Sequence, residues 1–228
     1  IENLNTEIPH WDFEKTKTQA KQKWNVELSK ITIEADDERK VNFYTSMYHS
    51  FMNPIIYNDV NGEYRGLDQN IYKAEGFTNY TIFSLWDTYR ALHPLFTIVQ
   101  PERVNDIINS LLLHYKETGL LPVWELVGNE TNTMIGYHAI PVIADAILKG
   151  FNGFNIELAY DAMKTSAMQD KSDLNFLREL GYIPADKENE SVSKTLEYAY
   201  DDYCIAVVAN HLNNKDDYEY FMKRANNY

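Results

Sequence analysis

The stretch that begins at Ser84-Leu-Trp-Asp87 and continues past Pro101 to Gly119 predicts two helices joined by a short turn. Ser84 opens a Ser/Thr-x-x-acid capping pattern, so the first helix should begin there and run to about Val99. Pro101 suits the first position of the second helix, and Gly119 suits the left-handed position that ends it. A pair of helices with a tight connection is the unit from which all-α arrays are built.

Similar signals predict helices on both sides of this pair. The expected ranges are 12–30, 36–53, 133–149, 157–168, 174–180, 191–212 and from 216 onward. Asn61-Gly62 predicts a small β-hairpin near 55–67, with Ile55-Ile-Tyr57 and Tyr64 on either side, because both central residues of a type I′ turn need a positive φ.

The lengths of the connections indicate how the helices are arranged. Long connections at 54–80, 119–132 and 169–190 alternate with much shorter ones. Because successive helices are antiparallel, the long connections should all lie at one end, where a scaffold usually builds its binding site. We expect an all-α fold of helical hairpins, either an α-solenoid or about the first half of an (α/α)6 toroid. No regular repeat supports a consensus solenoid.

Composition narrows the range of functions. The 228 residues carry 34 acidic and 21 basic side chains, for a net charge of −13. This balance argues against a nucleic-acid partner and against docking on an anionic membrane. The apolar runs are too short for a membrane span. The single cysteine, Cys204, excludes an internal disulfide and is expected to be a buried packing residue.

Two groups of residues at the loop-bearing end are candidates for a binding site. Trp86, Asp87 and Arg90 lie on the first turns of one predicted helix, where Asp87 and Arg90 share a face. An aromatic ring that packs on C–H bonds, beside a carboxylate and a guanidinium that bond to hydroxyls, is typical of a sugar site. The simpler alternative is an intrahelical ion pair beneath a core tryptophan.

The second group lies in the connection 119–132 and just beyond it. It consists of Trp124, Glu125, Asn129 and Glu130, with His138 on the next predicted helix. A loop with so many apolar neighbours should be packed, so its acids need partners. A histidine in this position is more often a hydrogen-bonded core residue than a catalyst.

Other segments carry less chemistry. Asp201-Asp202 lies within a helix, and we expect one surface acid and one partnered acid rather than a catalytic pair. The sequence shows no nucleophile motif, no glycine-rich phosphate loop and no zinc motif such as H-E-x-x-H.

Long motifs resemble one enzyme family, glycoside hydrolase family 92. The matching segments are Tyr57–Gly66, Phe83–Leu95, Gln100–Val104, Leu121–Thr131, Met134–His138 and Ser191–Asp202. The resemblance covers nearly the whole chain. It implies a calcium-dependent exo-α-mannosidase, many of which cut α-1,2 links, that inverts the anomeric centre. It also implies a periplasmic or extracellular protein with a β-sandwich before an (α/α)6 catalytic domain.

The resemblance also assigns parts of the chain. Residues 1–36 correspond to a linker helix region after a β-sandwich, and residues 37–228 to the N-terminal half of the catalytic domain. The family's general acid and base motifs would follow Tyr228, so no catalytic residue or metal ligand is assigned here, and the fragment alone should be inactive. The α-mannoside should contact Trp86 and Asp87. Further substrate-binding candidates are Arg90, Trp124, Glu125, Asn129, Glu130 and His138.

A helical protein-interaction module is the alternative of a different class. Such a module should line a long concave surface with aromatic side chains. A sugar site should instead bring Trp86, Asp87, Trp124 and Glu125 together at one end, with Asp87 and Glu125 less than about 20 Å apart.

Overall fold

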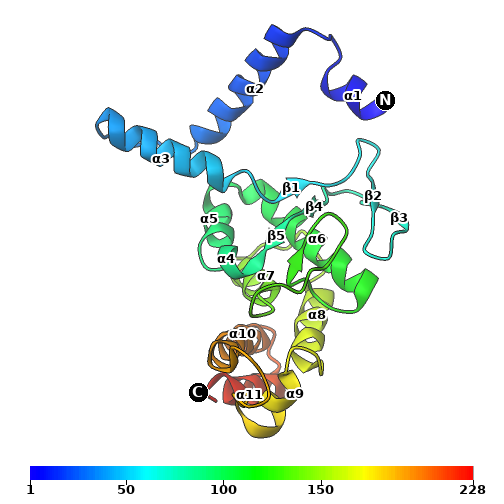
Figure 1. Cartoon of the computed structure of the whole chain (residues 1–228), viewed down its shortest axis with the longest axis vertical. Coiled ribbons are helices and arrows are strands. Elements are labelled where there is room, and N and C mark those ends of the chain that lie inside the picture. Colours follow the sequence, from blue (N-terminus) through cyan, green and yellow to red (C-terminus); the bar gives the residue numbers. More distant parts are fainter. Residues whose placement is uncertain (228) are drawn as a thin grey trace.

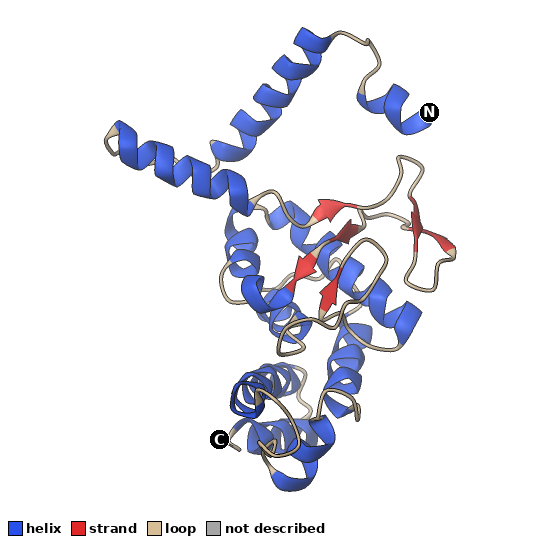
Figure 2. Cartoon of the chain, in the orientation of Figure 1, coloured by secondary structure: helices blue, strands red, loops and turns tan. Residues whose placement is uncertain are grey.

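The computed structural model describes residues 1–227 as a helical protein with three small sheets (Figures 1 and 2). The helices within that range are α1 (Glu2–Glu7), α2 (Phe13–Leu28), α3 (Asp37–Ser50), α4 (Leu85–Thr88), α5 (Leu92–Val99), α6 (Pro101–Thr118), α7 (Ala139–Leu148), α8 (Ile156–Met168), α9 (Leu174–Leu180), α10 (Ser191–His211) and α11 (Lys215–Ala225). The all-α class is confirmed, and the arrangement fits the predicted first half of a helical toroid.

Local signals placed several helix ends correctly. Asp12 and Asp36 are the N-caps of α2 and α3, and their carboxylates accept the backbone N–H groups of Lys15 at 3.0 Å and of Arg39 at 2.9 Å. Gly119 ends α6 in the left-handed region with a φ of 81°. A capping side chain, or a glycine that can adopt a positive φ, is a local property of the sequence, so these helix ends can be predicted.

The small sheets pair differently from the predicted hairpin. β1 (Ile55–Ile56) pairs with β4 (Tyr80–Thr81), and β2 (Glu63–Arg65) pairs with β3 (Ile71–Lys73), both antiparallel. Asn61-Gly62 does form a turn, closed by the Gly62 N–H on the carbonyl of Asp59 at 2.9 Å. Only Gly62 has a positive φ, 86°, so the turn is not type I′, and the strands around it find other partners.

The helix predicted to run from Ser84 to Val99 is two helices, α4 and α5. They are separated at residues 89–91, and Ala91 is the N-cap of α5. Pro94 explains the break, since it has no N–H to donate to the carbonyl of Arg90 and its ring would clash with that group in a continuous helix.

The helix predicted from Thr133 begins only at Ala139. Met134 has a φ of 74° and Gly136 a φ of 94°, and left-handed residues cannot continue a right-handed helix. Residues 133–138 are therefore a loop that leads into α7, with His138 as its N-cap.

The core is built around α7, whose sequence is apolar on nearly all sides. Eight of its residues are buried, and α5, α6, α8 and α10 contribute to the same apolar cluster. By contrast, α2 has no buried residue, and α2 and α3 extend away from the body in Figure 1. Within residues 1–227, no helix combines the length and the apolar character that a bilayer crossing needs.

Candidate functional site

The third sheet brings the two candidate groups together. β5 (Phe83–Ser84) pairs antiparallel with β6 (Trp124–Glu125), so that Ser84 lies opposite Trp124 and Phe83 opposite Glu125. Asp87 and Trp124 line one groove of about 340 Å³. The other residues that line it are His49, Ser50, Asn53, Pro54, Ile82, Ser84, Thr88, Leu92 and His93.

Asp87 is exposed at this groove. The Ser84 hydroxyl donates a hydrogen bond of 2.7 Å to its Oδ2 atom, and no other hydrogen bond to this carboxylate is made within residues 1–227. The half-buried Trp124 indole lies in the same wall. In this groove the carboxylate of Asp87 lies with Trp124, and not with Trp86 as the sequence predicted.

Trp86 and Arg90 do not line the groove but turn toward α10. The indole Nε1–H of Trp86 donates to Oε1 of Glu197 at 3.1 Å, and an Arg90 guanidinium nitrogen lies 3.5 Å from the same oxygen. The Arg90 guanidinium also lies 5.0 Å from the centre of the Trp86 ring, a cation–π distance. The intrahelical pair of Asp87 and Arg90 considered from the sequence is not formed.

His138 is a core residue between two carboxylates, as the more common role of such a histidine predicted. Its Nδ1 lies 2.8 Å from Oδ1 of Asp201, and its Nε2 lies 3.1 Å from Oε2 of Glu197. The ring stacks on Tyr89 with centroids 4.0 Å apart. Only 1% of His138 is exposed, so it has no access to the groove.

Asp201 and Asp202 are both fully buried, which corrects the expectation of one surface acid. Burial raises the pKa of Asp201, against the opposing effect of His138. Asp202 accepts a hydrogen bond of 2.9 Å from Nε of Arg224, and burial raises its pKa to about 7. Each carboxylate therefore has its own partner on a different element. Cys204 is also buried, as predicted.

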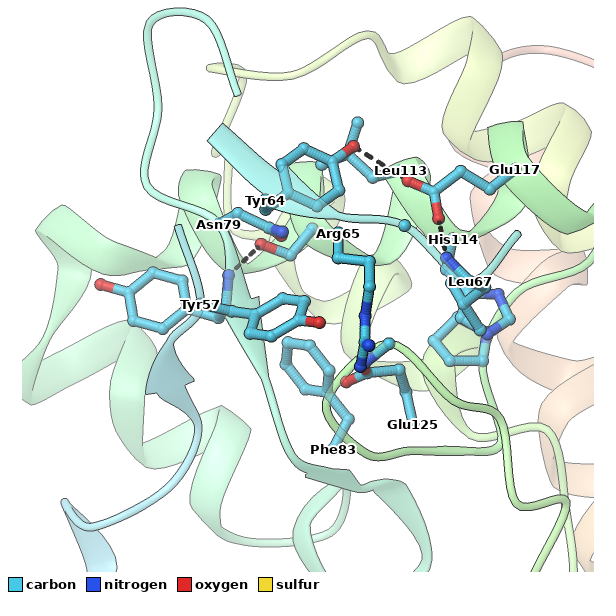
Figure 3. A pocket seen from close by; sticks show the side chains of 15 residues that line it. Tyr57, Tyr64, Arg65, Leu67, Asn79, Phe83, Leu113, His114, Glu117 and Glu125 are labelled. Carbon is cyan, nitrogen blue, oxygen red and sulfur yellow. Dashed lines mark hydrogen bonds between the residues drawn. The ribbon is translucent and has the colours of Figure 1, made fainter. Parts of the chain in front are cut away.

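Glu125 holds the loop rather than facing the groove. Its carboxylate accepts hydrogen bonds from the Thr81 hydroxyl at 2.7 Å, from the Gly128 N–H at 2.9 Å and from the Ile82 N–H at 3.2 Å. Burial raises its pKa. Glu125 lines a separate cavity of about 20 Å³ between the loop and the β2–β3 hairpin, with Tyr57 among its walls (Figure 3).

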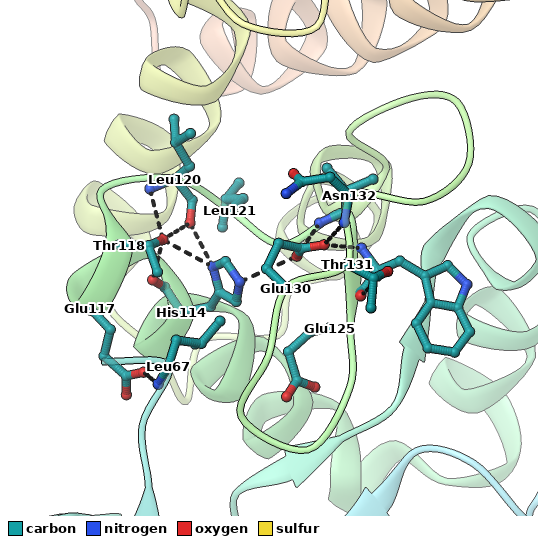
Figure 4. A network of polar contacts seen from close by, with 12 residues as sticks. Leu67, His114, Glu117, Thr118, Leu120, Leu121, Glu125, Glu130, Thr131 and Asn132 are labelled. Carbon is teal, nitrogen blue, oxygen red and sulfur yellow. Dashed lines mark hydrogen bonds and ion pairs between the residues drawn. The ribbon is translucent and has the colours of Figure 1, made fainter. Parts of the chain in front are cut away.

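Glu130 fixes the backbone that carries Trp124. It accepts the N–H groups of Val123 and Trp124, each at 2.9 Å, and of Asn132 at 2.7 Å, and it lies 3.3 Å from Nε2 of His114 (Figure 4). Burial alone would raise its pKa, but these contacts outweigh burial and hold the pKa below its usual value.

Asn129 lies exposed in the same loop. Its side-chain amide makes one long hydrogen bond of 3.4 Å, to the carbonyl of Val127. It is not among the residues that line the groove.

Comparison with known proteins agrees with this architecture. Residues 1–228 match the model of the glycosyl hydrolase family 92 catalytic domain. The chain belongs to glycosyl hydrolase family 92. It is similar to the family GH92 alpha-mannosidase BT3965 from Bacteroides thetaiotaomicron, with 54% identity and a TM-score of 0.95 over 98% of this chain and 31% of that one. A structure of that enzyme in complex with mannoimidazole aligns with a TM-score of 0.96.

More distant relatives agree. The family GH92 inverting mannosidase BT2199 from Bacteroides thetaiotaomicron VPI-5482 is 30% identical, with a TM-score of 0.92 over 99% of this chain and 32% of that one. An uncharacterized secreted glycosidase of Arthroderma benhamiae is 28% identical over 98% of this chain and 27% of its own length. The family 92 chain thus spans about a third or less of these relatives.

Glu197 is the residue of this candidate site that sequence reasoning missed. It lies one helical turn before Asp201, so the spacing places two acids on one face of α10. Nothing in the sequence connects that face with Trp86, Arg90 and His138, because these residues meet only after the helices have packed.

Residues 1–227 do not supply a metal centre by themselves. No three His, Cys, Asp or Glu side chains in that range gather into a group that could hold a metal ion. These residues therefore form no complete site for the calcium ion that the family resemblance implies, and none of them is assigned as a ligand.

Proposed function

We propose that this chain supplies sugar-binding residues for an α-mannosidase that releases terminal mannose from α-mannosides. In this proposal Trp124 packs against the C–H face of the mannose ring, and Asp87 accepts hydrogen bonds from its hydroxyl groups. The observation that carries the proposal is the shared groove of these two residues, which the β5–β6 pairing brings together. Family membership favours this function over a helical interaction module.

The names of the relatives support the substrate class. Three of the similar structures are of two mannosidases, and one of these enzymes was solved with mannoimidazole bound. The groove is also small and partly apolar, as suits a single sugar ring. We extend the proposal to α-1,2 links, as the family resemblance implies.

Inversion is the proposed stereochemical outcome. The 30% identical relative is described as an inverting mannosidase. Inverting glycosidases place two carboxyl groups roughly 6.5–9.5 Å apart across the scissile bond. The two acids of the connection 119–132, Glu125 and Glu130, are bound to backbone N–H groups, so we assign neither as acid or base. We expect the chain on its own to bind sugar without hydrolysing it.

Two further properties remain proposals. We propose that activity requires calcium, and that residues 1–227 do not supply a complete set of ligands for it. We also propose that the protein acts in the periplasm or outside the cell, which the secreted relative supports.

Mannose release from defined α-mannobiosides tests this function in the protein that carries the chain. We expect release from the α-1,2 disaccharide, loss of activity with a chelator and recovery with added calcium. Proton NMR of the first product should show β-mannose, because inversion of an α-linkage gives the β-anomer. If no α-mannoside releases mannose with calcium present, the proposed function is wrong.

A further inference from the structure

The segment that carries Asp87 is too short to hold its own position. α4 has four residues, and the chain leaves helical geometry before α5 begins. An isolated turn of this length is unstable in water, so tertiary contacts must set its direction. The direction of α4 in turn sets where the Asp87 carboxylate lies in the groove.

Three side chains of this segment converge on one carboxylate of α10. Trp86 donates its indole N–H to Glu197 at 3.1 Å, Tyr89 donates its hydroxyl at 2.9 Å, and an Arg90 nitrogen lies at 3.5 Å. They are separated from Glu197 by more than 100 residues of sequence. Glu197 is therefore the anchor that faces α4 on the side away from the groove.

Glu197 is itself supported from the core. His138 lies between Glu197 and Asp201, at 3.1 Å from the first and 2.8 Å from the second. The exposed fraction is 1% for His138 and 0% for Asp201. The Nε2 atom of His138 points into this cluster without a well-directed hydrogen bond. The Tyr137 N–H also holds Asp201, at 3.2 Å.

We propose that Asp201, His138 and Glu197 form a positioning relay that fixes α4 and thereby the Asp87 carboxylate in the sugar groove. The relay rests on the proposed function only for its effect on catalysis. A buried group of ionisable side chains stabilises a fold poorly compared with apolar side chains of the same volume, and its best-attested benefit is to select one arrangement of the chain. Asp201, His138 and Glu197 have such a role if they select the direction of α4.

Kinetics of the protein that carries this chain test the relay first. Glu197→Gln should raise the KM for an α-mannoside by about tenfold or more, while kcat changes by less than about threefold, because a misplaced Asp87 weakens sugar binding. Asp201→Asn should act in the same direction. Glu190→Gln is the matched control, since Glu190 is exposed next to the start of α10. An unchanged KM in a folded Glu197→Gln protein would overturn the proposal.

A double-mutant cycle keeps the test independent of a general loss of stability. Trp86→Phe removes the indole donor to Glu197 and also shrinks the ring beside Arg90. Its effect on KM and that of Glu197→Gln should be non-additive, because both weaken the same contact between α4 and α10. Additive effects would mean that Glu197 does not act through Trp86.

A spectroscopic measurement separates the relay from the proposed activity. In protein labelled with fluorotryptophan, the Trp86 resonance is the one lost in Trp86→Phe. Glu197→Gln and Asp201→Asn should shift or broaden that ¹⁹F resonance and leave the exposed Trp11 unaffected. If the protein releases no mannose but the Trp86 resonance responds, the proposed function fails and the relay stands. If mannose is released and the Trp86 resonance is unmoved, the relay fails alone.

Discussion

Trp86 and Glu197 are joined by a hydrogen bond of 3.1 Å across 111 residues of sequence. Trp86 therefore contacts α10, while its neighbour Asp87 lines the groove. Successive residues of a helix point about 100° apart, so an indole held against α10 leaves the next side chain free to face the groove. The aromatic wall of the groove then comes from Trp124, on a different element.

Gly136, in the loop 133–138 that precedes α7, should not tolerate a side chain. It has a φ of 94°, and a Cβ there would lie 2.1 Å from Nε2 of His138. Gly136→Ala should therefore lower the free energy of unfolding by about 3 kcal/mol or more, through left-handed strain and displacement of the imidazole. Gly150→Ala is the control, since its φ is 85° and nothing lies within 4 Å of the added atom. Urea unfolding that gives equal losses for the two variants would contradict this account.

Glu130 should contribute to stability through the backbone of Trp124. Glu130→Ala leaves three N–H groups without an acceptor, and we expect a loss of about 2–4 kcal/mol in the free energy of unfolding. Asn129→Ala, which removes an exposed side chain with one weak contact, should change it by less than about 0.5 kcal/mol. Denaturant titration measures both values. If Glu130→Ala lowers the free energy of unfolding no more than Asn129→Ala, Glu130 does not stabilise the backbone around Trp124.

His93 should make the fold sensitive to mild acid. Burial lowers its pKa from 6.5 to about 4. The unfolded chain then binds a proton that the folded chain does not, so this contribution to stability is present above pH 6.5 and is lost as the pH falls toward 4. The loss amounts to about 3 kcal/mol from this group.

The variant His93→Phe isolates that contribution. The ring lies between Phe83 and Phe96, with centroids 6.4 and 6.1 Å away, so a phenyl ring suits the site. Unfolding at pH 7 and pH 4 should show a smaller acid loss in His93→Phe than in the unmodified protein. The exposed His211→Phe should show no such difference. If His93→Phe loses as much unfolding free energy between pH 7 and pH 4 as the unmodified protein, other groups cause the acid sensitivity.

The sequence predicted the features that depend on local chemistry. The caps at Asp12 and Asp36, the end at Gly119 and the all-α class follow from neighbouring residues. The broken helix at Pro94 could have been predicted from the missing N–H alone. Strand partners such as Ile55 with Thr81 depend on contacts across 26 positions and carry no local signal.

The candidate site was predicted as a set of residues but not as an arrangement. The eight candidates have different roles. Asp87 and Trp124 line the groove, while Trp86, Arg90 and His138 surround Glu197. Glu125 and Glu130 hold the loop through hydrogen bonds to its backbone, and Asn129 is an exposed residue of that loop. Residue type indicated sugar chemistry, but burial and partners decide which side chains can touch a ligand, and these depend on tertiary packing.

Binding of mannoimidazole to the protein that carries this chain tests the central claim most directly. Isothermal titration calorimetry should show that Trp124→Ala and Asp87→Asn each raise the Kd by about tenfold or more, since each removes a groove contact. Trp11→Ala is the control, because that ring is 73% exposed elsewhere. Unchanged affinity in folded Trp124→Ala and Asp87→Asn proteins would contradict the assignment of this groove as the mannose site.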